Sequence, residues 1–299
     1  ATWQDKLNVL EKNEESISLI NKKIIKFFYD KNIVGKRCLR AQWLGDIVPE
    51  VISQTENFYA YKYVEGDLAS NAITPKKIVN LLNWADTNLW TPVKYGGDFS
   101  EQCMFFYREK TVNRVKRFLA GYKEDSHHVI NEITVPTVQE LLDEVPWQYI
   151  SENSKPTKFH GDFILDNIII QKNGNFKLLD WRHEFGLNSL FAGDLYYDLA
   201  KLNHNLTVNH DIICRDLFEV KVNNNVVTCD ILRKDNLVKC NEAFSEKVKD
   251  MGYNMDLVNI LTGIIWLNMA PLHHQPFDEF LFYYGKLKLA TSLQKWSLK

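Results

Sequence analysis

The stretch that decides the fold reads Phe159-His160-Gly161-Asp162-Phe163-Ile164-Leu165-Asp166-Asn167, and it is followed by an apolar run at residues 168–170 and by Asn173-Gly174. Asn-Gly between two strand-like runs is the strongest short-range signal for a β-hairpin with a two-residue turn. Such a turn pairs Ile168 with Leu179 and Asn167 with Asp180. The sequence therefore predicts a hairpin whose open end carries two polar side chains opposite each other.

This register gives the open end of the hairpin the chemistry of a magnesium site. Directly opposed residues share one face of a sheet, with Cβ atoms about 4.5–5.5 Å apart. An amide oxygen from Asn167 and a carboxylate from Asp180 suit Mg²⁺, which takes one or two protein ligands besides phosphate oxygens and water. Asp162 precedes Asn167 by five residues, so its loop brings another carboxylate to the same end.

The bulk composition indicates a globular protein with room for two unequal lobes. The chain has 299 residues, 45% of them apolar and 25% charged, with a net charge of -2. This balance argues against a nucleic-acid partner, which requires a basic surface. The most apolar stretch, residues 257–272, is too short and too polar to span a bilayer, which takes about 20 apolar residues. We therefore expect a buried helix there and no membrane insertion.

The five cysteines are scattered and form no Cys-x-x-Cys pair. That pattern favours reduced thiols and a cytoplasmic location over a disulfide framework. The sequence makes no prediction about the oligomeric state.

The pattern of elements changes near Glu65-Gly66. Before it, strand-like runs predict a hairpin around Asn21-Lys22-Lys23, a helix at about residues 36–44 and a strand pair within residues 49–64. After it the chain is mainly helical, with helices after the Thr74-Pro75 cap and at residues 103–120, a Thr137/Glu140 capping box, and a hairpin at residues 218–231. We expect an α+β fold with a small β-rich lobe, residues 1–65, and a larger α-helical lobe, residues 66–299.

The spacing of Asp162, Asn167 and Asp180 matches the catalytic-loop Asp and Asn and the later metal-binding Asp of protein kinases. His160-Gly161-Asp162 replaces His-Arg-Asp, and Asp180-Trp181 replaces Asp-Phe-Gly. With Gly193-Asp194 and Tyr197-Asp198-Leu199-Ala200, these motifs resemble the aminoglycoside phosphotransferase and choline kinase superfamily over about residues 15–205. The resemblance implies a two-lobed protein-kinase-like fold and a phosphotransferase that uses ATP and Mg²⁺ to phosphorylate a small-molecule hydroxyl.

The resemblance also implies roles for the matching residues of the catalytic hairpin. Asp162 would accept or orient the proton of the acceptor hydroxyl, and Asn167 and Asp180 would hold Mg²⁺ on the nucleotide phosphates. His160 and Asp198 would support the backbone of the catalytic loop.

In the small lobe, Lys26 resembles the lysine that binds the α- and β-phosphates, and the segment from Tyr61 to Glu65, with Tyr61 and Tyr63, would be the hinge beside adenine. The following helix, residues 37–44, has no glutamate to pair with Lys26. Either the partner of Lys26 comes from elsewhere, or Lys22 or Lys23 serves instead. The missing glutamate is also the only support for an alternative, a nucleotide-binding pseudokinase.

The acceptor is the least determined part of the prediction. Arg182, His183 and Glu184 follow the metal-binding Asp, where acceptors dock in such kinases, so they are candidate substrate residues. Analogy with the family favours a sugar or polyol used in surface-polysaccharide synthesis. The alternative is choline or another amino alcohol, a cation that would require several acidic residues around it; the candidates are Glu184, Asp194 and Asp278.

Overall fold

The computed structural model describes residues 15–121 and 125–298. Its smaller lobe contains an antiparallel sheet in the order β1-β2-β4-β3, with the bounds β1 Glu15–Ile20, β2 Lys23–Phe28, β3 Val51–Gln54 and β4 Phe58–Lys62. Asn21 and Lys22 join β1 to β2 with φ angles of 49° and 59°, the left-handed values that a two-residue type I′ turn requires. The predicted N-terminal hairpin is confirmed.

Helix α2 (Lys31–Leu44) packs against this sheet. It begins five residues before the predicted start because Asp30 caps it, with Oδ1 accepting a hydrogen bond of 2.9 Å from the backbone N–H of Asn32. The helix buries two arginines, Arg37 and Arg40. Buried charges need polar partners, and both arginines find them on the other lobe.

The hairpin that the sequence predicts to be catalytic, called the catalytic hairpin below, consists of β9 (Ile168–Ile170) and β10 (Phe176–Leu178). The predicted register is wrong by one residue, because Ile168 pairs with Leu178 rather than with Leu179. Residues 172–174 form a three-residue loop, and Gly174 adopts the left-handed φ of 83° that this loop type needs at its third position. Consequently Leu179, not Asp180, lies opposite Asn167, with a backbone hydrogen bond of 2.7 Å.

A third strand, β5 (Asp67–Leu68), pairs with β9. Gly66 precedes it with a φ of 148°, and a Cβ there would lie 2.5 Å from the carbonyl oxygen of Ile170. The chain thus leaves the small-lobe sheet after Lys62 and joins the catalytic hairpin at Asp67. The division that we propose between residues 65 and 66 falls within this connection.

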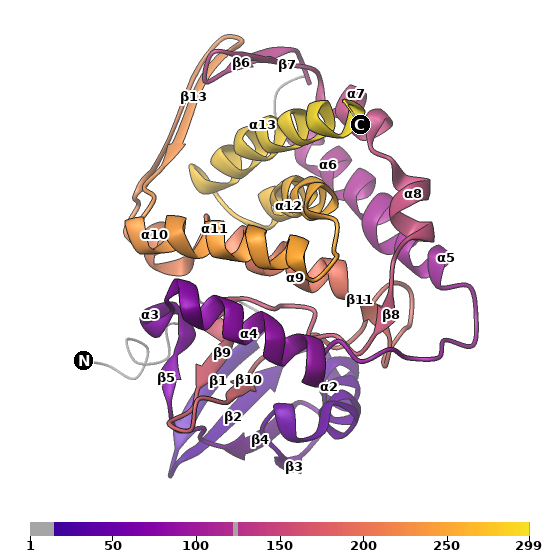
Figure 1. The fold of residues 1–299 in the computed structure, drawn as a ribbon, viewed down its shortest axis with the longest axis vertical. Helices are drawn as coiled ribbons and strands as arrows, with labels where there is room; N and C mark the ends of the chain where they lie inside the picture. The colour runs from indigo at the N-terminus through magenta and orange to yellow at the C-terminus, as the bar shows by residue number, and fades with distance from the viewer. Residues whose placement is uncertain (1–14, 122–124, 299) are drawn as a thin grey trace.

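The larger lobe is built around α12 (Met255–Met269), with α13 (Phe277–Ser297), α9 (Leu195–Asn205) and α6 (Lys110–Ala120) packed around it (Figure 1). The window from Met255 to Leu272 is long and apolar enough to cross a membrane by composition alone, but 72% of it is buried inside the fold. It is a core helix, as the sequence predicted.

The predicted helix at residues 103–120 is one helical run that begins earlier, as α5 (Phe99–Met104), and passes through a π-helical turn, η2 (Phe105–Glu109), into α6. Such π turns are rare in proteins, and those that occur often lie at functional sites. The other described α-helices of this lobe are α3 (Ala69–Ala72), α4 (Pro75–Asn88), α7 (Val138–Glu144), α8 (Trp147–Glu152), α10 (His210–Cys214) and α11 (Asp235–Asp250).

The predicted late hairpin is β12 (Phe218–Asn223) with β13 (Val226–Ile231). It is part of a larger sheet in the order β12-β13-β6-β7, which adds β6 (His128–Ile130) and β7 (Ile133–Val135). A separate short pair joins β8 (Pro156–Thr157) to β11 (Gly193–Asp194).

Candidate active site

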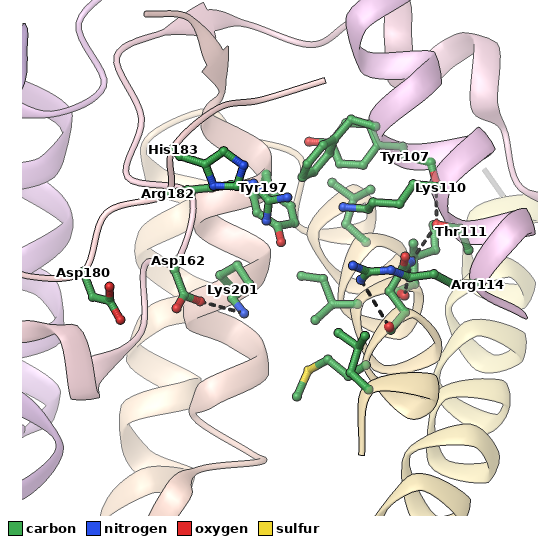
Figure 2. A pocket seen from close by; sticks show the side chains of 18 of the residues that line it. Tyr107, Lys110, Thr111, Arg114, Asp162, Asp180, Arg182, His183, Tyr197 and Lys201 are labelled. Carbon is green, nitrogen blue, oxygen red and sulfur yellow. Dashed lines mark hydrogen bonds and ion pairs between the residues drawn. The ribbon is translucent and has the colours of Figure 1, made fainter. Parts of the chain in front are cut away.

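A cavity of about 300 Å³ lies between the predicted catalytic loop, residues 159–167, and helices α6, α9 and α12 (Figure 2). We call it the central cavity. Its charged lining residues are Arg37, Lys110, Arg114, Asp162, Asp180, Arg182 and Lys201. Its volume lies at the lower end of the range of small-molecule sites, about 300–1,000 Å³.

Asp162 is held in one orientation by two side chains. Lys201 Nζ lies 2.8 Å from one carboxylate oxygen, and Asn167 Nδ2 donates to the other at 3.1 Å. Burial raises the pKa of the Asp162 carboxyl, but the adjacent Lys201 ammonium outweighs it and lowers the pKa to about 2. Asp162 is therefore ionised at neutral pH and weakly basic, which suits a group that orients a hydroxyl better than one that removes its proton.

The backbone of the catalytic loop is anchored by His160 and Asp198. The Asp198 carboxylate accepts hydrogen bonds from the backbone N–H groups of His160 (2.8 Å) and Gly161 (2.7 Å). His160 Nδ1 accepts from the backbone N–H of Asp162 at 3.1 Å, and Nε2 lies 2.7 Å from the carbonyl oxygen of Leu179. Both contacts are satisfied by a neutral ring with its proton on Nε2, and burial lowers the His160 pKa to about 4.

Lys26 and Arg37 both form ion pairs with Asp180. Lys26 is buried, at 6% exposure; burial lowers the pKa of its ammonium, and Asp180 opposes this shift. The partner of Lys26, which the sequence left open, is thus the predicted metal ligand Asp180. Helix α2 contributes Arg37 to the same group, where a glutamate was expected. Lys22, in the turn, and Lys23, at the start of β2, are both exposed.

The two predicted adenine-side tyrosines lie in different surroundings. The ring of Tyr61 is buried against Trp181, with centroids 6.4 Å apart, and Trp181 Nε1 donates to the carbonyl oxygen of Arg37 at 2.8 Å. Tyr63 is 45% exposed, and its backbone N–H donates to the carbonyl oxygen of Lys22 at 2.8 Å. Of these two tyrosines, only Tyr63 therefore presents an exposed ring.

The predicted metal ligands fit a magnesium ion chemically. Asn167 directs its Nδ2 protons to the backbone and side-chain oxygens of Asp162, which leaves the amide oxygen for a cation. Within residues 15–121 and 125–298, no group of three or more His, Cys, Asp or Glu side chains forms a metal-ligand cluster. An ion held by Asn167 and Asp180 would thus complete its shell with phosphate and water, as Mg²⁺ usually does.

The three candidate substrate residues separate in the structure. Arg182 and His183 line the central cavity, and burial together with the adjacent Arg182 lowers the His183 pKa to about 4, so its ring is neutral. Glu184 instead accepts from Lys36 at 2.5 Å and does not line the cavity.

Four charged residues of the cavity lining were not identified as site residues from sequence: Arg37, Lys110, Arg114 and Lys201. Lys110 and Arg114 are four residues apart and so share a face of α6, a pattern that any charged helix surface also shows. Lys201 interrupts the buried run of α9, and a lysine in such a run needs an anionic partner. Of these four residues, Lys201 is thus the one whose place in the sequence pattern indicates a role in the site.

No protein-family model and no curated protein matches this chain. Among solved structures, the choline kinase LicA from Streptococcus pneumoniae superposes with a TM-score of 0.51 at 13% identity, covering 96% of this chain and 96% of that one. The gentamicin complex of APH(2")-IIa superposes with a TM-score of 0.50 at 15% identity, covering 93% of this chain and 88% of that one. The chain therefore has the two-lobed, protein-kinase-like α+β fold shared by aminoglycoside phosphotransferases and choline kinases.

Proposed function

We propose that this chain is an ATP- and Mg²⁺-dependent phosphotransferase that acts on a hydroxyl of a small molecule. The observation that carries the proposal is the ionised Asp162 in the wall of the central cavity, held by Lys201 and Asn167. Asp180 lines the same cavity and gathers Lys26 and Arg37. A positioned carboxylate beside a cluster of phosphate-binding groups is what phosphoryl transfer requires of a protein.

The residues divide the work between orientation and charge. Asp162 accepts a hydrogen bond from the acceptor hydroxyl and directs its oxygen for in-line attack. Lys26 and Arg37 supply positive charge to the nucleotide phosphates. His160 and Asp198 hold the loop backbone, and Tyr63 contributes to the adenine side. A magnesium ion held by Asn167 and Asp180 would supply further charge neutralisation on the phosphates.

For the acceptor, we favour a sugar or polyol over an amino alcohol. That the phosphorylated product is used in surface-polysaccharide synthesis stays a prediction. None of the three acids named for a cationic acceptor lines the cavity. Asp194 is buried and accepts from Tyr107 at 2.7 Å, Glu184 pairs with Lys36, and Asp278 is buried on α13.

All five cysteines are free thiols, which supports the cytoplasmic location that we propose.

A nucleotide-binding pseudokinase is the second candidate. It is favoured by one observation, that the predicted metal ligand Asp180 is already paired with both Lys26 and Arg37. In that case the protein would bind a nucleotide and transfer nothing.

Substitution of Asp162 by Asn tests the proposal. We expect Asp162→Asn to lower kcat by at least about 100-fold, because the aligned carboxylate is lost, while Mg-ATP binding stays within a few-fold. The assay is ATP consumption over a panel of sugars, amino alcohols and aminoglycosides, with calorimetric binding of Mg-ATP in parallel. Asp143→Asn, at an exposed position of α7, is the control. Clean Mg-ATP binding without turnover of any acceptor would favour the pseudokinase.

A further inference from the structure

Three cations of the central cavity have no carboxylate partner among the described residues. They are Lys110, Arg114 and Arg182. The protein contacts of the two arginines include carbonyl oxygens: Arg114 Nη1 lies 3.3 Å from that of Asn268, and Arg182 Nε lies 2.9 Å from that of Glu184. The lining carries five cationic side chains and two carboxylates, so three positive charges are in excess.

The two lining carboxylates do not neutralise this cluster. Asp162 is paired with Lys201 and Asp180 with Arg37. Lys110 is the extreme case: burial lowers the pKa of its ammonium well below the usual value, and Arg182, Arg114 and Lys201 lower it further. Holding unpaired cations side by side in a half-buried cavity wall is costly, and an anion in the cavity would offset that cost.

The aromatic side chains of the cavity do not form a cage for a cationic ligand. The Lys110 ammonium lies 3.4 Å from the centre of the Phe106 ring and 5.7 Å from that of Tyr197, and the Arg182 guanidinium lies 5.1 Å from the Phe106 ring. These rings already bind cations of the protein itself. A quaternary ammonium ligand would be repelled by the positive charge of the cavity, and it would find the faces of the Phe106 and Tyr197 rings already occupied by Lys110 and Arg182.

Asn268 adds a separate requirement to the same cavity. Its Nδ2 donates to Thr111 (2.6 Å) and to the carbonyl oxygen of Ile264 (2.9 Å), whereas its buried Oδ1 has no hydrogen-bond partner in the part of the chain that the structure describes. A buried unpaired acceptor is unfavourable, and a hydroxyl of a ligand would satisfy it.

We infer that the acceptor is a polyol that carries an anionic group, a phosphate or a carboxylate, which binds at Lys110, Arg114 and Arg182. The inference rests on the proposed phosphotransferase function and narrows its substrate class. The reacting hydroxyl lies at Asp162. Its oxygen bonds to the γ-phosphorus of ATP, the bond from that phosphorus to the β–γ bridging oxygen breaks, and ADP and the hydroxyl proton are released.

The position of the cations separates this anion from the ATP phosphates. Lys110 and Arg114 project from α6 toward the cavity, across it from Asp162 and Asp180 (Figure 2). The proposed phosphate ligands Lys26 and Arg37 belong to the small lobe, at the Asp180 edge. Lys110 and Arg114 thus lie across Asp162 from the Asp180 edge where Lys26 and Arg37 gather, which leaves separate cations for the acceptor and for ATP.

The test measures binding and turnover with matched ligands. Glucose, glucose 6-phosphate, glucuronate, glucosamine and choline are titrated by calorimetry into the protein with ADP, and each is then offered as an acceptor with ATP. We expect glucose 6-phosphate or glucuronate to bind at least about tenfold more tightly than glucose, since charge-assisted hydrogen bonds are the strong ones. The two anions distinguish a phosphate from a carboxylate site. Tighter binding of glucosamine or choline, or no anion binding, overturns the inference.

Matched variants locate the anion. Lys110→Met and Arg114→Met should each remove the preference for anions and leave Mg-ATP affinity unchanged. Lys116→Met and Arg117→Met, which make the same charge changes at exposed positions of α6, should retain it. Anion binding that survives Lys110→Met and Arg114→Met would mark an adventitious ion only and overturn the assignment. Turnover of neutral or cationic acceptors alone overturns this inference but keeps the phosphotransferase, whereas anion binding without any turnover supports the cavity and overturns the phosphotransferase.

Discussion

At the scale of single residues, Arg37 is the most unusual feature of the site. It reaches from α2 to the same Asp180 oxygen that Lys26 contacts, and its pKa is raised because the attraction of Asp180 outweighs burial, which acts to lower it. Two cations on one carboxylate leave a net positive charge next to the proposed phosphate position. Arg37 therefore contributes to phosphate binding as well as to the placement of Asp180.

Replacing Arg37 tests that dual role. We expect Arg37→Ala to raise the Kd of Mg-ATP about tenfold, the loss of roughly one charge-assisted hydrogen bond, with Arg37→Lys in between. Lys36→Ala, the neighbouring position on the same helix, removes the same charge outside the Asp180 cluster and should change the Kd less than twofold. Calorimetry with an ATP analogue measures the effect. An unchanged Kd in Arg37→Ala would limit Arg37 to holding Asp180 in place.

Asp198 predicts how the site responds to pH. Burial raises its pKa to about 6, although the N–H groups of His160 and Gly161 act in the other direction. Because the folded-state pKa exceeds the unfolded value of about 3.9, this group's contribution to stability is greatest below pH 4 and is lost as the pH rises through 6. Its charged form is nevertheless the one that accepts both backbone hydrogen bonds.

We therefore expect kcat/KM to fall as the pH drops through about 6, where Asp198 takes up a proton and its hold on the loop weakens. His160 and His183 do not account for such a change, since burial lowers both pKa values to about 4. The measurement is a pH–rate profile from 5 to 8. Asp194, whose pKa burial also raises to about 6, supplies the control, because Asp194→Asn should keep the acidic limb. A flat profile would show that protonation of Asp198 does not loosen the loop.

At the scale of elements, the catalytic hairpin shows what a local pattern can determine. Asn173-Gly174 predicted the hairpin correctly and its register incorrectly. The side chain of Asn173 accepts a hydrogen bond of 3.0 Å from the backbone N–H of Asn175, which favours a three-residue loop over the two-residue turn. Both loops place Gly174 in a left-handed conformation, so the dipeptide alone does not distinguish them.

Asp162 and Asp180 line the same cavity although the register differs from the predicted one. Their positions depend on the conformation of loop residues more than on the strand pairing. Gly161 adopts a φ of 88°, and a Cβ there would lie 2.5 Å from the Arg182 Cβ; the glycine of His-Gly-Asp is needed for this close approach. Asp180 itself has a φ of 55°, which Asp tolerates better than most residues. The sequence motif thus predicted the position of Asp162 and Asp180 more reliably than the strand pairing that was derived from the Asn173-Gly174 turn.

The cations of α6 mark the limit of prediction from sequence. The helix itself was predicted, but the face that meets the cavity depends on the π-helical turn at residues 105–109 and on packing against α12. Neither is encoded in a local pattern. The charge of the acceptor site, and with it the substrate class, could be inferred only from the assembled lobe.

At the scale of the whole molecule, Arg40 joins the two lobes. This buried α2 side chain donates to the carbonyl oxygens of Phe159 (2.5 Å) and Leu190 (2.8 Å), and its guanidinium lies 3.8 Å from the centre of the Phe159 ring. Burial lowers its pKa to about 9, partly offset by Asp198, so the side chain is charged at neutral pH. The small lobe thereby holds the first residue of the catalytic loop.

Arg40→Met should consequently affect both stability and catalysis. Loss of two charge-assisted hydrogen bonds at roughly 1.5–3 kcal/mol each, partly offset by the buried methionine, leads us to expect a decrease of about 3 kcal/mol in the free energy of unfolding. Lys31→Met, on the same helix, breaks only the exposed 2.6 Å pair with Glu56 and should cost less than about 1 kcal/mol. Urea titration measures both, and kcat of the folded variant reports on the loop. If Arg40→Met unfolds at the wild-type midpoint with unchanged kcat, the lobes are held together by their apolar contacts, and α2 transmits nothing to the catalytic loop.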